Sequence, residues 1–261
     1  LKHDPEAVTI MFRAFNRWLV EDWGFARENR IYAAPYLTLA DVDWACEELD
    51  WALAQGARSI VMRAAAPTTA SGQVAPGHPS NDRFWARVAE AGVTCVVHAG
   101  DAGYSSHGYA NDGFTTDFAG VPQPIRMLQL ERPIEDFLSS LVCDHLFVRH
   151  PNLRIASVEN GSKFLGGLFD KLRITARKME GWWAEDPVET FRRHIWINPF
   201  WEDDVDDVIE LMGADRVIFG SDWPHIEALP RPLDYLADVA HLDEVTRRKV
   251  LLDNVTELNT P

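Results

Sequence analysis

The sequence has little positive charge and no long apolar run. Its 25 lysines and arginines are outnumbered by 40 aspartates and glutamates, which gives a formal net charge of −15 at pH 7. The negative electrostatic potential of such a protein repels nucleic-acid phosphates and anionic lipids. No apolar run approaches the roughly 18 residues that a membrane span requires. We therefore expect neither a nucleic acid nor a membrane as partner.

Cysteine is scarce, and two familiar nucleotide motifs are missing. Cys46, Cys95 and Cys143 are widely spaced and match neither a zinc-binding pattern nor a disulfide framework. They suit a reducing compartment, which predicts a cytoplasmic protein. There is no glycine-rich dinucleotide fingerprint after the first strand and no phosphate-binding P-loop, which argues against a Rossmann domain or a nucleotide hydrolase.

Short apolar runs alternate with segments of helical periodicity along the chain. Strands are expected near residues 31, 60, 95, 156, 196 and 218. Helices are expected near 5–25, 41–55, 81–91, 134–148, 163–178, 203–212, 232–242 and 243–252. This alternation predicts a parallel sheet covered by helices. Residues 1–261 show no repeat or linker, so we expect one α/β domain, a (β/α)₈ TIM barrel or a fragment of one.

Three of the predicted strands end in side chains that can bind a metal. Apolar runs lead directly into His98 and Glu159, and a third run leads into Gly220-Ser221-Asp222. The carboxyl ends of barrel strands face one shared mouth, where the chemistry lies. An imidazole with carboxylates suits zinc or a similar divalent ion. Singly, each residue has a structural alternative: a hydrogen-bonded histidine, an ion-paired glutamate, or an aspartate that caps a helix. Together they predict a shared site.

The same residues carry a resemblance to a known family. His98 at a strand end, His150-Pro-Asn-Leu-Arg-Ile-Ala-Ser-Val-Glu-Asn-Gly161, and Phe219-Gly-Ser-Asp-Trp-Pro224 resemble the amidohydrolase-related (amidohydrolase 2) family, over roughly residues 28–255. That family includes aminocarboxymuconate semialdehyde decarboxylase and resorcylate-type decarboxylases. The resemblance implies a distorted, metal-dependent TIM barrel in which His98 on strand 5 and Asp222 on strand 8 bind zinc or, alternatively, manganese. It also implies a homodimer as a plausible assembly.

The sequence departs from the family pattern at two points. The family's first strand supplies a further pair of ligands, and no such pair precedes Arg30. Since six strands cannot close an eight-stranded barrel, we expect the chain to hold strands 3 to 8, with an N-terminal part absent from this sequence. Secondly, Glu159 stands where the family usually has a histidine that acts as general acid or base. Glu159 is therefore either a base or an additional ligand.

Further residues near the predicted mouth are candidates for contact with a small-molecule substrate. Tyr104 and His107 lie in a long loop after His98, whereas Trp223 and His225 directly follow Asp222. Arg63 ends its strand and would pair with a substrate carboxylate. Each of these side chains has an alternative as a solvated loop residue or an ion-pair partner.

The sequence therefore predicts a metal-dependent hydrolase acting on a small amide, ester or aromatic substrate through metal-activated water, with Glu159 and Asp222 as catalytic residues. Non-oxidative decarboxylation of an aromatic or semialdehyde acid is the alternative that the family resemblance implies. A catalytically decayed barrel serving as a binding or partner subunit is a second alternative. A metal-free glycosidase with paired carboxylates is disfavoured because it leaves His98 without a role.

Overall fold

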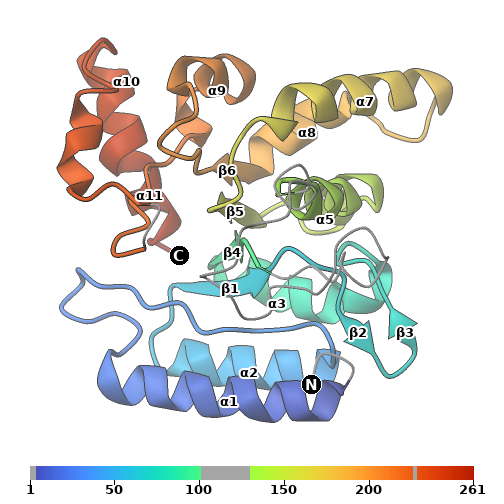
Figure 1. Ribbon diagram of the computed structural model, residues 1–261. Coiled ribbons are helices and arrows are strands. Elements are labelled where there is room, and N and C mark those ends of the chain that lie inside the picture. The colour runs from blue at the N-terminus through green and yellow to red at the C-terminus, as the bar shows by residue number, and fades with distance from the viewer. Residues whose placement is uncertain (1–3, 101–129, 226–227) are drawn as a thin grey trace, which may run out of the picture.

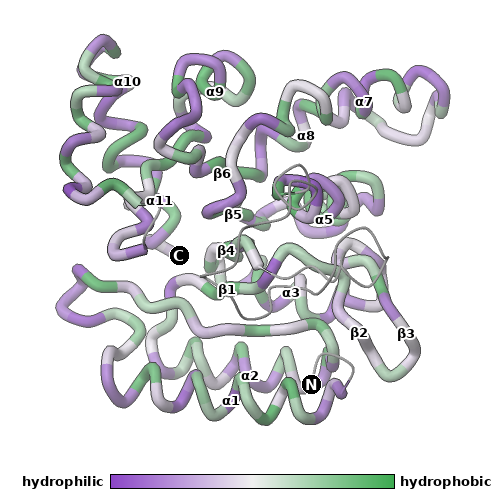
Figure 2. Tube along the Cα trace, viewed as in Figure 1, coloured by the Kyte–Doolittle hydropathy of each residue, from purple (hydrophilic) through white to green (hydrophobic). Residues whose placement is uncertain are grey.

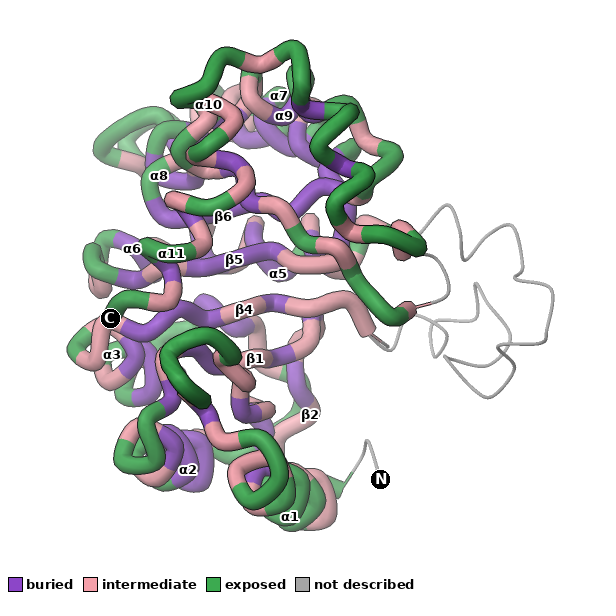
Figure 3. Tube along the Cα trace, turned by 90° about the vertical axis from the view of Figure 1, so that its left-hand side faces the viewer, coloured by how far each residue is buried: buried purple, intermediate pink, exposed green. Residues whose placement is uncertain are grey.

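The computed structural model describes residues 4–100, 130–225 and 228–261 (Figure 1). Its centre is a four-stranded parallel sheet in the order β1 (Ser59–Arg63), β4 (Thr94–His98), β5 (Arg154–Val158) and β6 (Ile195–Ile197). Four of the six predicted strands are confirmed by these elements. The strands lie side by side, and β1, β4 and β5 become less buried at their carboxyl ends (Figure 3).

One further segment pairs with each edge of this sheet. Tyr36 forms a parallel bridge to Val61 of β1, and Val217 forms one to Ile197 of β6. The sequence prediction was right about the position near 218, although the pairing there is a bridge and not a full strand. It was wrong near 31, because Ile31 instead forms an antiparallel bridge with Arg27. The parallel pairing begins a few residues later, at Tyr36.

Helices cover one face of the sheet (Figure 1). They are α2 (Val42–Ala54), α3 (Asp82–Ala91), α5 (Arg132–Cys143), α6 (Leu146–Arg149), α7 (Phe164–Lys178), α8 (Pro187–His194) and α9 (Val205–Met212). Asp41 caps α2 by accepting a hydrogen bond from the Trp44 amide at 3.0 Å. Alternate strand residues such as Ile60 and Val97 are fully buried in the main core that these helices share with the sheet. The opposite residues of each strand therefore face away from the helices.

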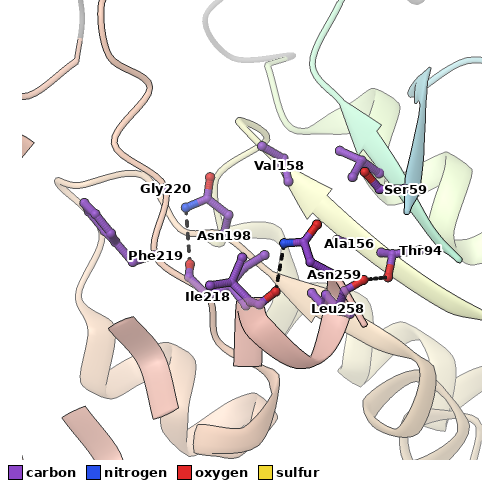
Figure 4. A pocket seen from close by; sticks show the side chains of 12 residues that line it. Ser59, Thr94, Ala156, Val158, Asn198, Ile218, Phe219, Gly220, Leu258 and Asn259 are labelled. Atoms are coloured by element: carbon purple, nitrogen blue, oxygen red, sulfur yellow. Dashed lines mark hydrogen bonds between the residues drawn. The ribbon is translucent and has the colours of Figure 1, made fainter. Parts of the chain in front are cut away.

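The C-terminal elements are a 3₁₀ turn (Pro232–Leu236), α10 (Glu244–Arg248), a π-helical turn (Lys249–Asp253) and α11 (Asn254–Leu258). Tyr235 and Val250 of the two turns belong to the main core, whereas α11 lies against the second face of the sheet. Leu258 packs with Ala156 and Ile218, and its carbonyl accepts a hydrogen bond from Thr94 Oγ1 at 2.7 Å. A cavity of about 160 Å³ remains between α11 and the sheet (Figure 4). It lies on the face that a closed barrel would enclose.

Helix α1 (Pro5–Asp22) confirms the predicted N-terminal helix. Its buried residues are the polar Thr9 and Asn16, whereas Met11 and Phe15 are 53% and 43% exposed. Figure 2 shows hydrophobic residues recurring along α1 between hydrophilic ones. Phe12, Leu19 and Val20 are partly buried against the core. Beside them, Asn16 donates a hydrogen bond to the buried carboxylate of Glu48 on α2. Among the described residues, no helix has the length and apolar character that crossing a membrane requires.

A short hairpin follows β1 in the chain. Strands β2 (Thr68–Thr69) and β3 (Gly72–Gln73) pair in antiparallel fashion. Gly72 has φ +106°, a conformation that side chains with a Cβ rarely adopt. Short 3₁₀ turns at Pro79–Asn81 and Ala214–Arg216 complete the described elements.

Candidate metal centre

The register of the sheet brings the predicted strand-end residues to one edge. Arg63 at the end of β1 pairs with His98 at the end of β4, which pairs with Val158 at the end of β5. Glu159 directly follows Val158, and its Oε2 lies 2.7 Å from His98 Nε2. Two of the three predicted site residues are therefore in direct contact, as the parallel arrangement requires.

Both nitrogens of the His98 ring have a partner. Nδ1 lies 2.9 Å from the carbonyl oxygen of Ala99, which can only accept a hydrogen bond, so Nδ1 carries the hydrogen. Nε2 is therefore the nitrogen that faces Glu159. The hydrogen bond to Glu159 raises the pKa of His98, and partial burial opposes this rise. A histidine whose Nδ1–H is held by a backbone carbonyl has the tautomer and orientation typical of a metal ligand through Nε2.

Glu159 and Asp222 share an uncommon backbone conformation. Their φ angles are +57° and +52°, in the left-handed region that residues with a side chain adopt rarely. Such conformations cost free energy and occur frequently at functional sites. The positive φ angle thus changes the direction of the backbone at each of the two carboxylate residues.

Asn198 connects the segment that ends in Glu159 with the segment that leads to Asp222. This residue was not identified in the sequence analysis. It is 7% exposed and follows β6. Its Oδ1 accepts from the Glu159 amide at 3.4 Å, while its Nδ2 donates to the carbonyls of Pro199 at 3.0 Å and Ile218 at 3.3 Å (Figure 4). A Cβ on Gly220 would lie 2.8 Å from Asn198 Oδ1, so glycine permits this close approach. The signal in the sequence was a polar residue directly after a buried strand.

Asp222 and His225 form a second histidine–carboxylate pair. Asp222 Oδ2 lies 2.8 Å from His225 Nδ1, and the Asp222 carbonyl accepts from the His225 amide at 2.8 Å. Glu159, Asp222 and His225 each offer one ligand atom, and these atoms all lie within 4.8 Å of one another. Two atoms bound to one ion by bonds of about 2.0–2.4 Å are at most about 4.8 Å apart. These three ligand atoms are therefore close enough to one another to share a single divalent ion, whereas His98 does not belong to this group.

A network of hydrogen bonds shapes the loop that follows Glu159. Asp203 Oδ2 accepts from the Ser162 amide at 2.9 Å, the Ser162 hydroxyl at 2.8 Å and the Phe200 amide at 3.1 Å. Gly161 has φ +69°, and a Cβ there would lie 2.5 Å from Glu131 Oε1. Burial raises the pKa of Glu131, whose carboxylate accepts from the Lys163 amide. These residues position the loop, and no motif in the sequence identified them.

The remaining predicted residues have different outcomes. Trp223 is 63% exposed beside Asp222, and its amide donates to Ser221 Oγ at 3.3 Å. Tyr104 and His107 lie outside the described residues. The roles of Arg63, Trp223 and His225 in substrate binding stay predictions. The cavity between α11 and the sheet is lined by Val158, Asn198 and Gly220 at the end nearest the site, but by none of the ligand candidates.

The chain is similar to several solved structures. An amidohydrolase from Mycobacterium avium subsp. paratuberculosis K-10 is 39% identical to this chain, with a TM-score of 0.92. The match covers 100% of this chain and 66% of that protein, so this chain spans less than two thirds of the length of that protein. A 2,6-dihydroxybenzoate decarboxylase from Rhizobium is 20% identical, with a TM-score of 0.72, over 98% of this chain and 79% of the other. A dihydroxybenzoic acid decarboxylase from Polaromonas sp. JS666, with bound manganese and the inhibitor 2-nitroresorcinol, is 19% identical, with a TM-score of 0.76, over 98% and 76%. The comparison with curated proteins gives no match.

These neighbours confirm the α/β fold class of the TIM-barrel hydrolases that the alternation of strands and helices predicted. The family model described as amidohydrolase matches residues 3–258. This match confirms the resemblance first seen at His98 and at the segment around Asp222, and the chain belongs to the amidohydrolase family.

Proposed function

We propose that the chain is the metal-dependent catalytic part of a hydrolase that acts on a small amide, ester or aromatic substrate. The observation that carries the proposal is the meeting of two histidine–carboxylate pairs, His98–Glu159 and Asp222–His225, at the carboxyl edge of a parallel sheet. His98 and Asp222 would hold the ion, either zinc or manganese. When bound, a divalent ion supplies Lewis acidity that activates water and polarises a carbonyl group.

The side chains around the ion would transfer protons and bind the substrate. Glu159 is 25% exposed and partly shielded from solvent, and its carboxylate accepts a proton from an attacking water or binds the ion itself. Arg63 is the register partner of His98, and its guanidinium would pair with a substrate carboxylate. The exposed ring of Trp223 would give a small aromatic substrate a stacking surface.

Decarboxylation of an aromatic acid is the second candidate, and a specific observation favours it. Arg63 is the register partner of His98, and its guanidinium would bind a carboxylate of the substrate in addition to the ion. The dihydroxybenzoate decarboxylases with the same fold act on compounds of this chemical class. We propose a cytoplasmic location and a homodimer as the assembly, on the grounds given by cysteine usage and by the family.

Metal content and product analysis test this proposal. We expect elemental analysis of the purified 261-residue chain to find about one zinc or manganese ion per chain, and Asp222→Ala to lose it. The control is Asp206→Ala, which breaks a similar pair with His241 at 2.8 Å on the surface and should keep the ion. Incubation with panels of amides, esters and aromatic acids then separates hydrolysis, which releases acid, from decarboxylation, which releases carbon dioxide. A protein that binds neither ion after reconstitution, even when a segment carrying the first-strand ligand pair is joined to this chain, would refute both candidates and leave a binding role.

A further inference from the structure

Asn160 connects the ends of two neighbouring strands. It directly follows Glu159 and is 2% exposed. Its side-chain Nδ2 lies 2.8 Å from the carbonyl oxygen of Val97 in β4 and 2.8 Å from that of Val158 in β5. Both carbonyls can only accept hydrogen bonds, so the nitrogen donates one hydrogen to each. A single buried side chain thus fastens β4 to β5 at the edge of the sheet where the candidate site lies.

These two carbonyls belong to the peptide groups that lead into His98 and Glu159. The peptide group before Glu159 is held at both ends, because its carbonyl accepts from Asn160 and its amide donates to Asn198 Oδ1 at 3.4 Å. The φ angle of Glu159 is the rotation of that residue relative to this planar group. Fixing the plane therefore limits how far Glu159 can relax from its φ of +57°.

The left-handed conformation decides on which face of the sheet the Glu159 side chain lies. Val158 is the register partner of His98, so the side chains of these two residues share the face away from the helices. Successive side chains of an extended strand point to opposite faces. An extended Glu159 would therefore point toward the helices, as the buried Ile155 does. The turn at Glu159 instead brings its Oε2 to 2.7 Å from His98 Nε2.

We propose that Asn160 is a positioning residue that keeps the Glu159 carboxylate against the His98 ring. The inference rests on the proposed function, in which Glu159 is a base or a ligand, and deepens it by naming the side chain that holds this group in place. A positive φ costs a residue such as glutamate free energy, so the turn needs support from its surroundings.

The hydrogen bonds of Asn160 supply that support because they depend on the turn. In an extended continuation of β5, the Asn160 Cα would lie about 6.6 Å beyond that of Val158, with its side chain standing perpendicular to the sheet. From there, Nδ2 could not reach the carbonyls of both Val97 and Val158. The two hydrogen bonds therefore stabilise the turned conformation of Glu159 relative to the extended one.

Asn254 offers a matched control. It is 3% exposed, and its Nδ2 also donates to two backbone carbonyls, those of Ala214 and Val217, at 2.8 Å each. Neither carbonyl belongs to a peptide group of the candidate site. Asn254→Ala and Asn160→Ala therefore remove the same number of side-chain hydrogen bonds of the same kind, but only the second change removes them beside the site.

The experiment combines crystal structures of the metal-free parent and variants with Mn²⁺ titrations of the same proteins. We expect both alanine variants to lower the melting temperature by a similar amount. In Asn160→Ala alone, Glu159 should adopt a negative φ, and its separation from His98 Nε2 should lengthen beyond about 4 Å. The dissociation constant of this variant for Mn²⁺ should rise by about 10- to 100-fold, the range typical of losing an outer-shell partner, whereas Asn254→Ala should leave it unchanged. Asn160→Ser, which keeps one donor, replaces the alanine variant if that variant does not fold.

The possible results separate this inference from the function on which it rests. If Glu159 keeps its positive φ and its contact with His98 in Asn160→Ala, the inference is refuted and the proposed function stands. The same holds if this variant binds Mn²⁺ as tightly as the parent, since the loss of Asn160 then leaves the site undisturbed. A protein that binds neither Mn²⁺ nor zinc, even with the first-strand segment joined to it, refutes the proposed function. The crystal structures then still decide whether Asn160 holds Glu159 in place.

Discussion

The buried carboxylate of Glu48 should be essential for attaching α1 to the rest of the fold. The Glu48 side chain has no exposed surface. It accepts hydrogen bonds from Arg17 Nη1 at 2.7 Å, Arg17 Nη2 at 3.1 Å, Arg13 Nε at 3.3 Å and Asn16 Nδ2 at 3.1 Å. Asn16 also bonds to both the amide and the carbonyl of Tyr36, the residue that bridges to β1. Glu48 thus joins α1, α2 and the edge of the sheet.

The expected cost of Glu48→Ala follows from these contacts. Removing one partner of a buried ion pair costs roughly 3–5 kcal/mol, because the other charge is left without compensation. The side chains of Arg13 and Arg17 are 45% and 35% exposed, so water can solvate both guanidinium groups in the variant. We therefore expect the lower end, a loss of about 3 kcal/mol in the free energy of unfolding.

Urea unfolding of the parent and the variant measures this loss. The matched control is Glu47→Ala, one residue earlier, where a 74% exposed side chain lies 3.7 Å from Arg13 and should contribute no more than about 0.5 kcal/mol. A double-mutant cycle with Arg17→Ala should give a coupling energy of about 1–3 kcal/mol. The reasoning fails if Glu48→Ala costs less than about 1 kcal/mol, or no more than Glu47→Ala.

Three further changes test the site and the core. Asn198→Ala should lower the free energy of unfolding by about 2 kcal/mol, since the Ile218 carbonyl loses its side-chain donor. Calorimetry should also show weaker metal binding by this variant. Unchanged metal binding would contradict the role of Asn198 in positioning Glu159. Gly161→Ala should destabilise the protein by more than about 1 kcal/mol in thermal unfolding, because φ is +69° and the new methyl group meets Glu131; a neutral result would refute the steric argument. Burial lowers the pKa of His194, so the unfolded chain takes up the proton first as the pH falls below about 6.5. Stability should then fall by at most about 1.4 kcal/mol per pH unit until the folded pKa is reached, and urea unfolding at several pH values should show a smaller slope for His194→Gln.

The parallel sheet and the proximity of His98 to Glu159 could be predicted because both depend on local sequence patterns. Buried strands appear as apolar runs, and parallel strands end at one edge, so His98 and Glu159 could be placed together without coordinates. The strand near 31 was wrong because short apolar runs are ambiguous. The pairing with β1 begins at Pro35, which has no amide hydrogen but whose carbonyl accepts from the Val61 amide, and continues with the Leu37 amide, which donates to the Val61 carbonyl.

Features that depend on distant contacts could not be predicted. The attachment of α1 depends in part on the hydrogen bond from Asn16 to Glu48, which lies 32 residues further along the chain. Asn198 acts through the ends of two other segments, and its spacing in the chain reveals neither partner. His225 was predicted only as a substrate contact, because the sequence does not show that the turn from Asp222 brings its ring back to that carboxylate.

The left-handed conformation of Glu159 and Asp222 implies that folding stability and the presence of these carboxylates oppose each other. Glycine adopts such φ angles without a steric penalty, and asparagine adopts them more readily than glutamate does. At these two positions, mutations that stabilise the chain are therefore the ones that remove its carboxylates. A lineage freed from the need for these carboxylates would gain stability by losing them, whereas this chain retains both.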